Sequence, residues 1–536
     1  MPTLNWIGKE AVVKHHKLVP FRMLQPVAEL SCSDASNPEN ENLIVQGDNL
    51  HALKALLPRY AEQVKCIYID PPYNTGNEGW VYNDNVNSPE IKRWLGEVVG
   101  KEGETLDRHD RWLCMMYPRL LLLKQFLRED GVIFVSIDDF ELHNLRILMD
   151  EIFGAACYKN TIAVRRGIKN VQAQFEDVSA LSLGHEYILV YSKNVKFRFP
   201  KLSLAHESTQ PGKWDTFWRG TDRHTMRYEL FGNLPETGQW RWEETRTKVA
   251  VKNYKDYLEN YSNQMTLDEW YVDNLSATNQ KLNFVRKSTE GSIQYYVPPS
   301  DGKLLSDNWM DILLSGNETS FDTEKNVTLI ERIIGWITNN NDLILDSFAG
   351  SGTTAHAVLK KNVEDGASRR FVLVEMDEHV AQNVTVERVK RVSQGYNKAN
   401  GDVVVGLGGG FKFCKLSPEP LFTAERQIRA DVTFAELAEF VWFTETGSGY
   451  PKVSKPSPLL GIHKGKAIYL LFNGILKDRG DLGGNVLNNR TLAVLPEHDG
   501  QRVIYGARSR FDKAKLARMK LEFKQLPYEL TVKSWV

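Results

Sequence analysis

The sequence predicts an α/β protein built on a doubly wound, parallel sheet, and three observations carry that prediction. Short apolar runs such as VKCIYI and GVIFVSI alternate with segments of helical character. Two of the apolar runs end in an aspartate followed at once by a turn, in IDPP and LDSFAGSG. The alternation stops between about residues 194 and 306 and then returns, so we expect the sheet to carry an insert.

Length and composition fit several globular domains. The chain has 536 residues, 42% of them hydrophobic and 25% charged. Its 67 Lys and Arg against 68 Asp and Glu exclude a highly basic histone-like or ribosomal protein. A local basic surface for nucleic acid stays open.

Cysteine usage and hydropathy indicate a cytoplasmic protein. No CxxC pair occurs and the number of cysteines is odd, which argues against a disulfide framework or a zinc cluster and fits a reducing compartment. No signal core opens the chain, and Arg119 and Lys124 interrupt the longest apolar stretch, so no membrane span is expected. The five cysteines are Cys32, Cys66, Cys114, Cys157 and Cys414.

The elements follow in order along the chain. In the first 193 residues, strands are expected at 43–46, 64–69, 131–137 and 185–191, and helices at 49–57, 111–128 and 140–153. After the insert, strands are expected at 343–345 and 371–374, and helices at 327–336, 353–361 and 379–392. The glycine-rich stretch 401–410 predicts a boundary before a C-terminal α+β domain. That domain is expected to hold a strand at 467–472 and a basic helix at 512–524.

The first candidate site is Asp70-Pro71-Pro72-Tyr73, which directly follows the apolar run 64–69. The prolines stiffen the turn and remove backbone donors while leaving carbonyl acceptors. The Asp70 carboxylate and the Pro71 carbonyl can therefore hold the two N–H bonds of an exocyclic amino group on a flat base, with Tyr73 over the ring. Held in this way, the nitrogen would point its lone pair at an electrophile, and no metal is needed. A plain strand-end turn is the alternative.

The second candidate site is the segment 346–354, DSFAGSGTT. Gly350 and Gly352 permit positive φ and a close approach of ligand, and Thr353 or Thr354 can cap the helix that follows. A strand, a glycine loop and a helix in this order form the nucleotide cradle of doubly wound sheets. No Lys follows the last glycine, so the segment is not a Walker P-loop.

An acidic residue at a suitable distance supports a nucleotide ligand. Glu375 ends the next apolar run, FVLVE, 23 residues after Gly352. An acid about 20 residues beyond a glycine loop usually reaches ribose hydroxyls. We therefore predict an adenosine-containing cofactor, the alternative being a glycine turn needed only for packing of the helix against the strand.

Together the two sites resemble those of DNA methyltransferases that use S-adenosylmethionine and methylate base amino groups. DPPY resembles their catalytic motif and FAGSGTT their cofactor loop, and the order, with the catalytic motif first, resembles the β class. The segments QGDNLHALKALLP, HEYILVYSK and GGGFKF are similar to those of type III modification (Mod) subunits. The resemblance spans roughly residues 4–415. It implies a permuted, Rossmann-like methyltransferase sheet with an inserted target-recognition domain.

The resemblance also implies roles for particular residues. The tetrapeptide Asp70, Pro71, Pro72 and Tyr73 would bind a flipped adenine. Glu375 would hold the cofactor ribose, Asp48 would approach the cofactor adenine, and Lys325 would meet the methionine carboxylate. The cofactor site as a whole would comprise Asp48, Lys325, Asp346, Phe348, Gly350, Gly352, Thr353 and Glu375.

Two features leave alternatives open. The family often has Pro after the lysine that corresponds to Lys325, whereas Asn326 stands here. Asp138 and Asp139 follow GVIFVSI and either face the site or cap the next helix.

His15 and His16 have no partner ligands in the sequence and are interpreted as structural or surface residues.

The implied division assigns 1–193 to the catalytic half, 194–306 to target recognition, 307–400 to the cofactor half and 411–536 to dimer, partner or DNA contacts. A paired amino group must be flipped out of the duplex to react. Basic and aromatic residues interleave in the insert and suit base edges and wedges, although most of its Trp and Tyr residues are expected to form its own core. The basic C-terminal helix either tracks phosphates or is a solvated face.

The sequence therefore predicts a site-specific methyltransferase that acts on adenine N6 in double-stranded DNA, with S-adenosylmethionine as cofactor. The resemblance makes it the modification subunit of a type III-like restriction–modification system and leaves room for a homodimer and for a helicase–nuclease restriction partner. Alternatives are an orphan methyltransferase, a DNA-recognition subunit with secondary or lost methylation, methylation of cytosine N4, and methylation of RNA or of glutamine in a protein.

Overall fold

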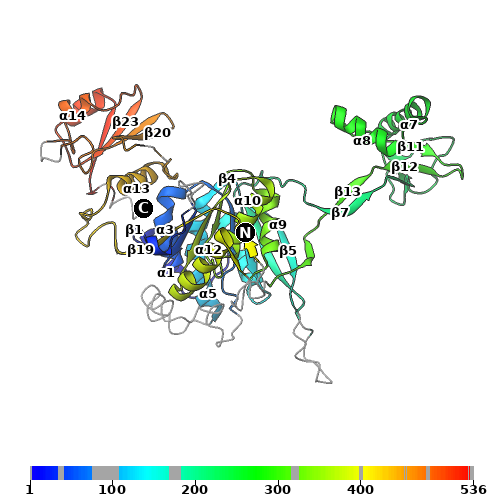
Figure 1. The fold of residues 1–536 in the computed structure, drawn as a ribbon. Helices are drawn as coiled ribbons and strands as arrows, with labels where there is room; N and C mark the ends of the chain where they lie inside the picture. Colours follow the sequence, from blue (N-terminus) through cyan, green and yellow to red (C-terminus); the bar gives the residue numbers. More distant parts are fainter. Residues whose placement is uncertain are drawn as a thin grey trace, which may run out of the picture. The chain divides into compact units, whose positions relative to one another are not determined.

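The chain forms two compact units in a computed structural model: Met1–Pro200 with Asp307–Val536, and Lys201–Ser306 (Figure 1). The structure describes residues 3–33, 42–74, 108–167, 181, 183–315, 325–397, 403–451, 453, 455–478, 483–528 and 530. Residues 194–200 of the predicted insert thus belong to the first unit.

A ten-stranded sheet organises the first unit, in the order β1-β19-β2-β16-β15-β3-β4-β6-β5-β14. Six adjacent strands, from β19 to β4, run parallel. Their bounds are β19 (Lys412–Pro420), β2 (Leu43–Gln46), β16 (Arg370–Glu375), β15 (Leu343–Asp346), β3 (Val64–Ile69) and β4 (Leu127–Ile137). This is the doubly wound core that the apolar runs predict.

Antiparallel pairs lie toward both edges of the sheet, so the sheet is mixed rather than wholly parallel. β6 (His185–Ser192) runs antiparallel to both β4 and β5 (Tyr158–Arg165), and β1 (Arg22–Pro26) runs antiparallel to β19. The outermost strand, β14 (Asn308–Leu313), is parallel to β5. An apolar run indicates that a strand is buried, but it says nothing about strand direction, and for that reason the sequence missed this feature.

Helices cover both faces of the sheet. Ile67 and Ile69 of β3 belong to one apolar core with α3 (Asn49–Tyr60), α5 (Arg108–Phe126) and α6 (Leu142–Phe153). On the opposite face, Phe134 of β4 lies 6.3 Å, between ring centroids, from Trp336 of α9 (Val327–Ile337), and α9 packs on α10 (Thr353–Asp365). Because side chains alternate along a strand, both faces of the central strands are buried.

The expected domain boundary at residue 411 is wrong for the sheet. β19 pairs with β2 through Lys412, Phe413 and Cys414, so the chain beyond the glycine-rich stretch completes the main sheet. Gly408 and Gly409 have φ of +71° and +75°. The amides of Leu407 and Gly408 donate to the carbonyls of Val392 and Ser393, so this part of the chain is held against the preceding helix.

A smaller sheet follows, in the order β20 (Leu459–His463), β21 (Lys466–Leu470), β23 (Gln501–Gly506) and β25 (Leu521–Gln525). Helix α13 (Phe434–Thr446) shares an apolar core with Phe21 and Met23 of the region around β1. The C-terminal part is therefore packed onto the main sheet through β1 and β19.

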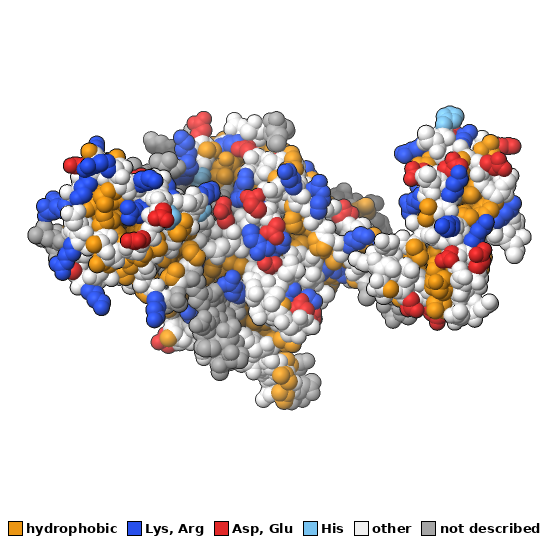
Figure 2. Space-filling view, turned by 90° about the horizontal axis from the view of Figure 1, so that it is seen from above, with side chains coloured by type: hydrophobic (Ala, Val, Ile, Leu, Met, Phe, Trp, Pro, Cys, Tyr) orange, Lys and Arg blue, Asp and Glu red, His pale blue; other side chains and the backbone are white. Residues whose placement is uncertain are grey.

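The basic C-terminal segment is not one helix. Helix α15 covers only Lys513–Arg518, and β25 follows it. Lys524 is buried and donates to Glu445 at 2.6 Å, so it does not contribute to a solvent-exposed basic face. Acidic and basic side chains are intermixed on the face of the molecule that Figure 2 shows.

The unit Lys201–Ser306 has its own aromatic core. Its three-stranded sheet consists of β11 (Val285–Lys287), β12 (Ile293–Val297) and β8 (Lys213–Thr216), with α7 (Glu244–Asn260) and α8 (Leu267–Thr278) beside it. Phe217, Trp240 and Trp270 are buried, whereas Trp218 is 44% exposed. Most of the aromatic residues thus stabilise the unit itself.

Among the helices of the described residues, none combines the length and the apolar character that crossing a membrane requires. The five cysteines are buried free thiols. His15 and His16 lie in the short helix α2 (His15–Leu18), where burial lowers the pKa of both imidazoles to about 4.

The position of β19 predicts that Phe413 stabilises the main sheet. Phe413 is fully buried, so Phe413→Ala should lower the free energy of unfolding by about 3–5 kcal/mol. Its exposed neighbour provides the control, because Lys412→Ala should change that free energy by no more than about 0.5 kcal/mol. Urea unfolding followed by circular dichroism measures both. If Phe413→Ala lowered the stability only in a separate unfolding transition of the C-terminal part, the role of β19 in the main sheet would be contradicted.

Candidate active site

Four parallel strands end at one edge of the sheet, and a predicted site residue follows or ends each of them. β3 leads into Asp70, β15 ends at Asp346, β16 ends at Glu375, and β2 leads through Gly47 to Asp48. The strands are adjacent in the order β2-β16-β15-β3. This edge, at the carboxyl ends of the strands, is where open α/β sheets bind ligands.

The DPPY loop is held against a buried lysine. Lys325 Nζ donates to the Tyr73 hydroxyl at 2.7 Å and lies 3.2 Å from Asp70 Oδ1. Lys325 and Tyr73 are buried, and the Asp70 side chain is 14% exposed. The structure thus brings the Lys325 ammonium against the carboxylate and the aromatic ring of the DPPY loop.

Burial and charge pairing have opposing effects on the pKa values of Asp70 and Lys325. Burial raises the pKa of Asp70, although Lys325 and a hydrogen bond from Tyr73 favour the charged carboxylate. For Lys325, burial opposes the charged form, but Asp70 and Glu186 outweigh it and raise the pKa of the ammonium. Burial also raises the pKa of Tyr73, which keeps the phenol neutral.

Packing behind the loop fixes its shape. Trp112 Nε1 donates to the Pro72 carbonyl at 2.7 Å, whereas no described residue donates to the carbonyl of Pro71. Asn74, at φ +58°, donates to the buried Glu141 at 2.5 Å. Thr75 and Gly76, which follow in the sequence, lie outside the described residues.

The glycine loop is organised by two carboxylates. Asp346 accepts from the Phe348 amide at 3.0 Å and from the Thr354 hydroxyl at 2.6 Å. Glu375 accepts from the Gly350 amide at 2.9 Å and from the Asp377 amide at 2.9 Å. Burial raises the pKa of Asp346 to about 7.

Gly352 is required by both conformation and space. Its φ is +79°, and a Cβ atom there would lie 3.2 Å from Thr385 Cγ2 and 3.3 Å from Val389 Cγ2. Thr353, expected among the cofactor residues, begins α10, and its hydroxyl accepts from Arg388 at 2.9 Å.

Asp48 stands at the start of α3 as its N-cap. It accepts from the His51 amide at 3.1 Å and pairs with Arg119 at 3.0 Å. Burial disfavours the charged form of Asp48, but Arg119, His51 and the backbone amides outweigh it and lower its pKa. The Asp48 side chain is 37% exposed, which leaves room for a ligand to reach it.

Two aspartates whose roles the sequence left open behave differently. Asp138 is 1% exposed and accepts from the Phe140 amide at 3.1 Å, so it organises the turn before α6. Burial raises the pKa of Asp138 to about 7. Asp139 is exposed.

Lys325 contacts the DPPY loop. The resemblance implies a role for it at the methionine carboxylate of the cofactor, and within the protein its ammonium lies on Asp70 and Tyr73. Sequence spacing could not reveal this, because 252 residues separate Lys325 from Tyr73.

Two further residues escaped the sequence interpretation. Glu186 in β6 is buried and lies 3.6 Å from Lys325 Nζ, although HEYILVYSK indicated only a strand. Arg388 of α12 (Val386–Gln394) donates to Ser351 and Thr353 of the glycine loop, at 2.9 Å each. No motif marked either residue.

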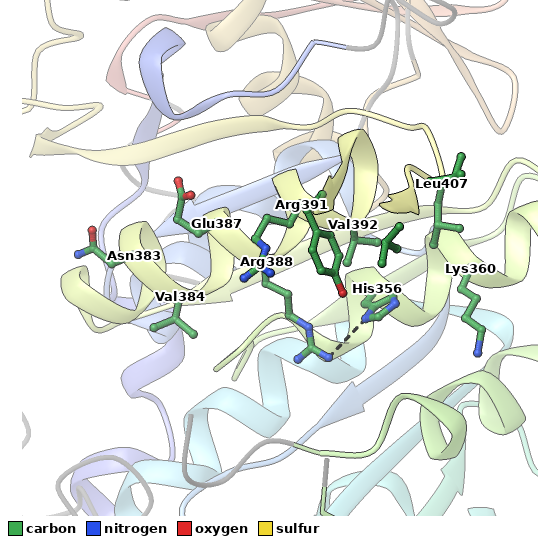
Figure 3. A pocket seen from close by; sticks show the side chains of 12 residues that line it. His356, Lys360, Asn383, Val384, Glu387, Arg388, Arg391, Val392 and Leu407 are labelled. Carbon is green, nitrogen blue, oxygen red and sulfur yellow. Dashed lines mark hydrogen bonds between the residues drawn. The ribbon is translucent and has the colours of Figure 1, made fainter. Parts of the chain in front are cut away.

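Arg388 also reaches a cavity behind the glycine loop. The cavity has a volume of about 290 Å³ and lies between α10, α12 and the hairpin of β17 (Gly395–Asn397) and β18 (Val403–Val405). In Figure 3 the Arg388 side chain extends toward His356, whose Nδ1 lies 3.4 Å from the guanidinium. The same guanidinium thus contacts the cavity wall and the loop.

The chain is similar to known proteins. The family model for DNA methylase (N6_N4_Mtase) matches residues 64–386. The StyLTI Mod subunit of a type III restriction–modification enzyme from Salmonella typhimurium is 30% identical over 74% of this chain and 60% of its own length. The type II methyltransferase M.KpnI of Klebsiella pneumoniae is 30% identical over 65% of this chain and 87% of its own length.

Among solved structures, the chain is similar to a DNA modification methylase of Thermus thermophilus in complex with S-adenosyl-L-methionine. The TM-score is 0.33 and the identity 14%, over 70% of this chain and 100% of the other. The chain spans about 60% of the length of the Salmonella relative.

The buried carboxylate of Asp346 predicts a pH-dependent stability. Its folded pKa of about 7 lies above the ordinary value of 3.8, so ionisation costs stability as pH rises through this interval. Asp346→Asn keeps the shape without titrating. The variant should therefore gain up to about 4 kcal/mol over the natural protein between pH 4 and pH 7.

Urea unfolding at several pH values measures the difference. The exposed Asp499 is the control, since Asp499→Asn changes only a surface residue and should alter the free energy of unfolding by no more than about 0.5 kcal/mol. If the difference in the free energy of unfolding for Asp346→Asn stayed constant between pH 4 and pH 7, the Asp346 carboxylate would ionise without a loss of stability.

Proposed function

Because the chain belongs to the DNA methylase family, we propose that it transfers a methyl group from S-adenosylmethionine to the N6 amino group of adenine in a specific sequence of double-stranded DNA. The observation that carries the proposal is the meeting of the DPPY loop and the glycine loop at the carboxyl ends of adjacent strands, β3 and β15. Such an arrangement holds an amino nucleophile next to a cofactor pocket.

The DPPY loop would bind the reacting amino group. The Asp70 carboxylate and the Pro71 carbonyl each accept one N–H bond, and the Tyr73 ring covers the base. Trp112 supports this geometry by engaging the Pro72 carbonyl, which keeps the loop from rotating. Held in this way, the amino nitrogen turns its lone pair toward the cofactor side of the site.

The residues of the glycine loop fit a cofactor that has an adenosine part and a positive charge. The loop offers a close backbone approach at Gly350 and Gly352, and Asp48 is accessible at the neighbouring strand end. Asp346 and Glu375 are buried carboxylates at the same edge and favour a cationic ligand. When bound, S-adenosylmethionine would supply an electrophilic methyl group on a sulfonium.

Glu375 would contact the cofactor ribose while keeping its bonds to the loop. Its two oxygens accept the backbone amides of Gly350 and Asp377, at 2.9 Å each. We propose that Lys325 acts on the base side of the site rather than on the methionine carboxylate, as its contacts with Asp70 and Tyr73 favour.

The unit Lys201–Ser306 would recognise the DNA sequence. It is a compact insert between β6 and β14, and the cationic groups of Arg241, Arg246 and Arg286 lie over aromatic rings at 4.1–4.3 Å. Arginines pre-oriented in this way suit base edges and phosphates. The base would leave the duplex to reach Asp70, at a cost of a few kcal/mol.

We further propose that the chain is the modification subunit of a type III-like system, because its relatives include Mod subunits. A restriction subunit and a second copy of the chain would then be its partners. Loss of catalysis, the rival interpretation, is disfavoured by the intact DPPY loop and glycine loop.

The first test uses a host that lacks DNA methyltransferases. The natural chain should mark one sequence motif with N6-methyladenine, seen by single-molecule sequencing and by mass spectrometry of nucleosides. Asp70→Ala should lower methyl transfer by at least about a hundredfold, since the acceptor of the amino proton is lost. It should leave S-adenosylmethionine binding intact in calorimetry.

Methylation of cytosine N4 alone would contradict the adenine assignment. Undiminished transfer by Asp70→Ala would contradict the catalytic role of the loop. The exposed Asp499→Ala serves as the control and should methylate as the natural chain does.

The second test concerns the cofactor loop and uses the two ends of α10. Gly352 and Gly366 both have positive φ, at +79° and +68°, but a Cβ would be crowded only at Gly352. Gly352→Ala should weaken S-adenosylmethionine binding by about tenfold or more, through displacement of the loop. Gly366→Ala should cost stability alone, about 1 kcal/mol. Calorimetry compares them, and equal affinities would contradict the proposed cofactor site.

A further inference from the structure

The site contains a buried carboxylate that the proposed reaction has not yet used, Glu186. Glu186 is 6% exposed. It lies in β6, which is two strands away from β3 in the sheet. Glu186 Oε2 lies 3.6 Å from Lys325 Nζ, and the same Nζ lies 3.2 Å from Asp70 Oδ1. One ammonium is therefore shared by two carboxylates.

Lys325 contacts both carboxylates and the tyrosine hydroxyl. Its ammonium donates to the Tyr73 hydroxyl at 2.7 Å and lies at ion-pair distance from Asp70 and Glu186. Within the described part of the chain, neither Asp70 Oδ1 nor Glu186 Oε2 accepts a well-aligned hydrogen bond. One positive charge thus compensates two acids.

We propose that Glu186 is a positioning residue for methyl transfer: its negative charge, at ion-pair distance from the same Lys325, offsets the stabilisation that Lys325 gives to the charged Asp70 carboxylate and so keeps that carboxylate able to accept the amino proton. This inference rests on the proposed function. It adds to that function a residue from the strand β6, outside both motifs.

The balance of the reaction shows why such a residue is needed. The amino nitrogen forms a bond to the methyl carbon, the bond from carbon to sulfur breaks, and its electron pair stays on sulfur. The sulfonium charge is thereby lost, and the nitrogen carries one proton too many. That proton passes to the Asp70 carboxylate, which becomes neutral and later releases it to water.

A carboxylate that is ion-paired with a lysine is a poorer proton acceptor, because the ion pair stabilises its charged form. Glu186 counteracts this effect, because its negative charge repels the charge on Asp70 and raises the pKa of Asp70.

The other groups around the two acids do not replace this function. Tyr68 and Tyr73 stay neutral, because burial raises the pKa of both phenols. Arg166 lies 3.4 Å from Glu186 Oε1, on the side away from the shared lysine contact at Oε2. The charged and titratable groups that face Asp70 or Glu186 are Tyr68, Tyr73, Asp138, Arg166, Lys325 and Asp346.

The test is the pH profile of Glu186→Gln, which removes the charge and keeps the shape. The probes are tritiated S-adenosylmethionine and DNA from a methylation-free host. The acid limb of kcat/KM should move to lower pH, because Asp70 loses the repulsion of a like charge. The plateau of kcat should fall by roughly ten- to hundredfold, no more than a positioned proton acceptor contributes.

A second readout does not depend on turnover. Binding of the recognition duplex without cofactor, followed by fluorescence anisotropy, should keep its affinity to lower pH in Glu186→Gln, since Asp70 stays charged there. A merely structural role would lower the folded fraction and leave both pH profiles in place.

Glu445 supplies a matched control. It is a buried glutamate bonded to a buried lysine, Lys524, with side-chain exposures of 6% and 9%, against 8% for Glu186 and 10% for Lys325. Glu445→Gln should keep both the acid limb and the kcat of the folded protein.

Unchanged pH profiles and kcat in Glu186→Gln, with an active natural chain and an inactive Asp70→Ala variant, would overturn this inference and leave the proposed function standing. A natural chain that methylates no DNA would overturn both.

Discussion

Parallel pairing of β2, β16, β15 and β3 forces four distant chain segments to end at one edge of the sheet. Because each strand is buried on both faces, its interior is mostly apolar and its acidic residues stand where it ends. Asp70, Asp346 and Glu375 stand at these ends, and the loops that follow must satisfy them. The catalytic loop, the glycine loop and their spacing all follow from this alignment of strands.

Buried carboxylates at one edge are costly, and the structure meets that cost in a different way at each position. Glu375 accepts two backbone amides, Asp346 accepts an amide and a hydroxyl, and Asp70 depends on an ammonium from a distant segment. A site of this kind favours a ligand that brings positive charge. The same electrostatics thus support binding of a sulfonium, and they link the fold directly to the proposed chemistry.

Sequence patterns anticipated the local structure well where a strand is buried on both faces. The expected strand at 64–69 has the same bounds in the structure, and the helix expected at 327–336 ends one residue later. The sequence patterns did not predict strand direction or pairing partners. They missed the antiparallel β6, the membership of β19 in the main sheet, and the short α15 followed by β25. Pairing partners depend on free energies between segments far apart in the chain, which no local period records.

The sequence by itself determined the chemistry that can occur: an acid and two prolines after a strand, a glycine loop before a helix, and an acid at the end of the next strand. These are local, because turn geometry and capping depend on neighbouring residues. Only the tertiary structure decided which groups meet. Lys325 lies on Asp70 and Tyr73, Glu186 shares that lysine, and Arg388 ties the glycine loop to α12. The physical reason is that long-range charge pairing in a buried site is set by the packing of strands and helices, not by spacing along the chain.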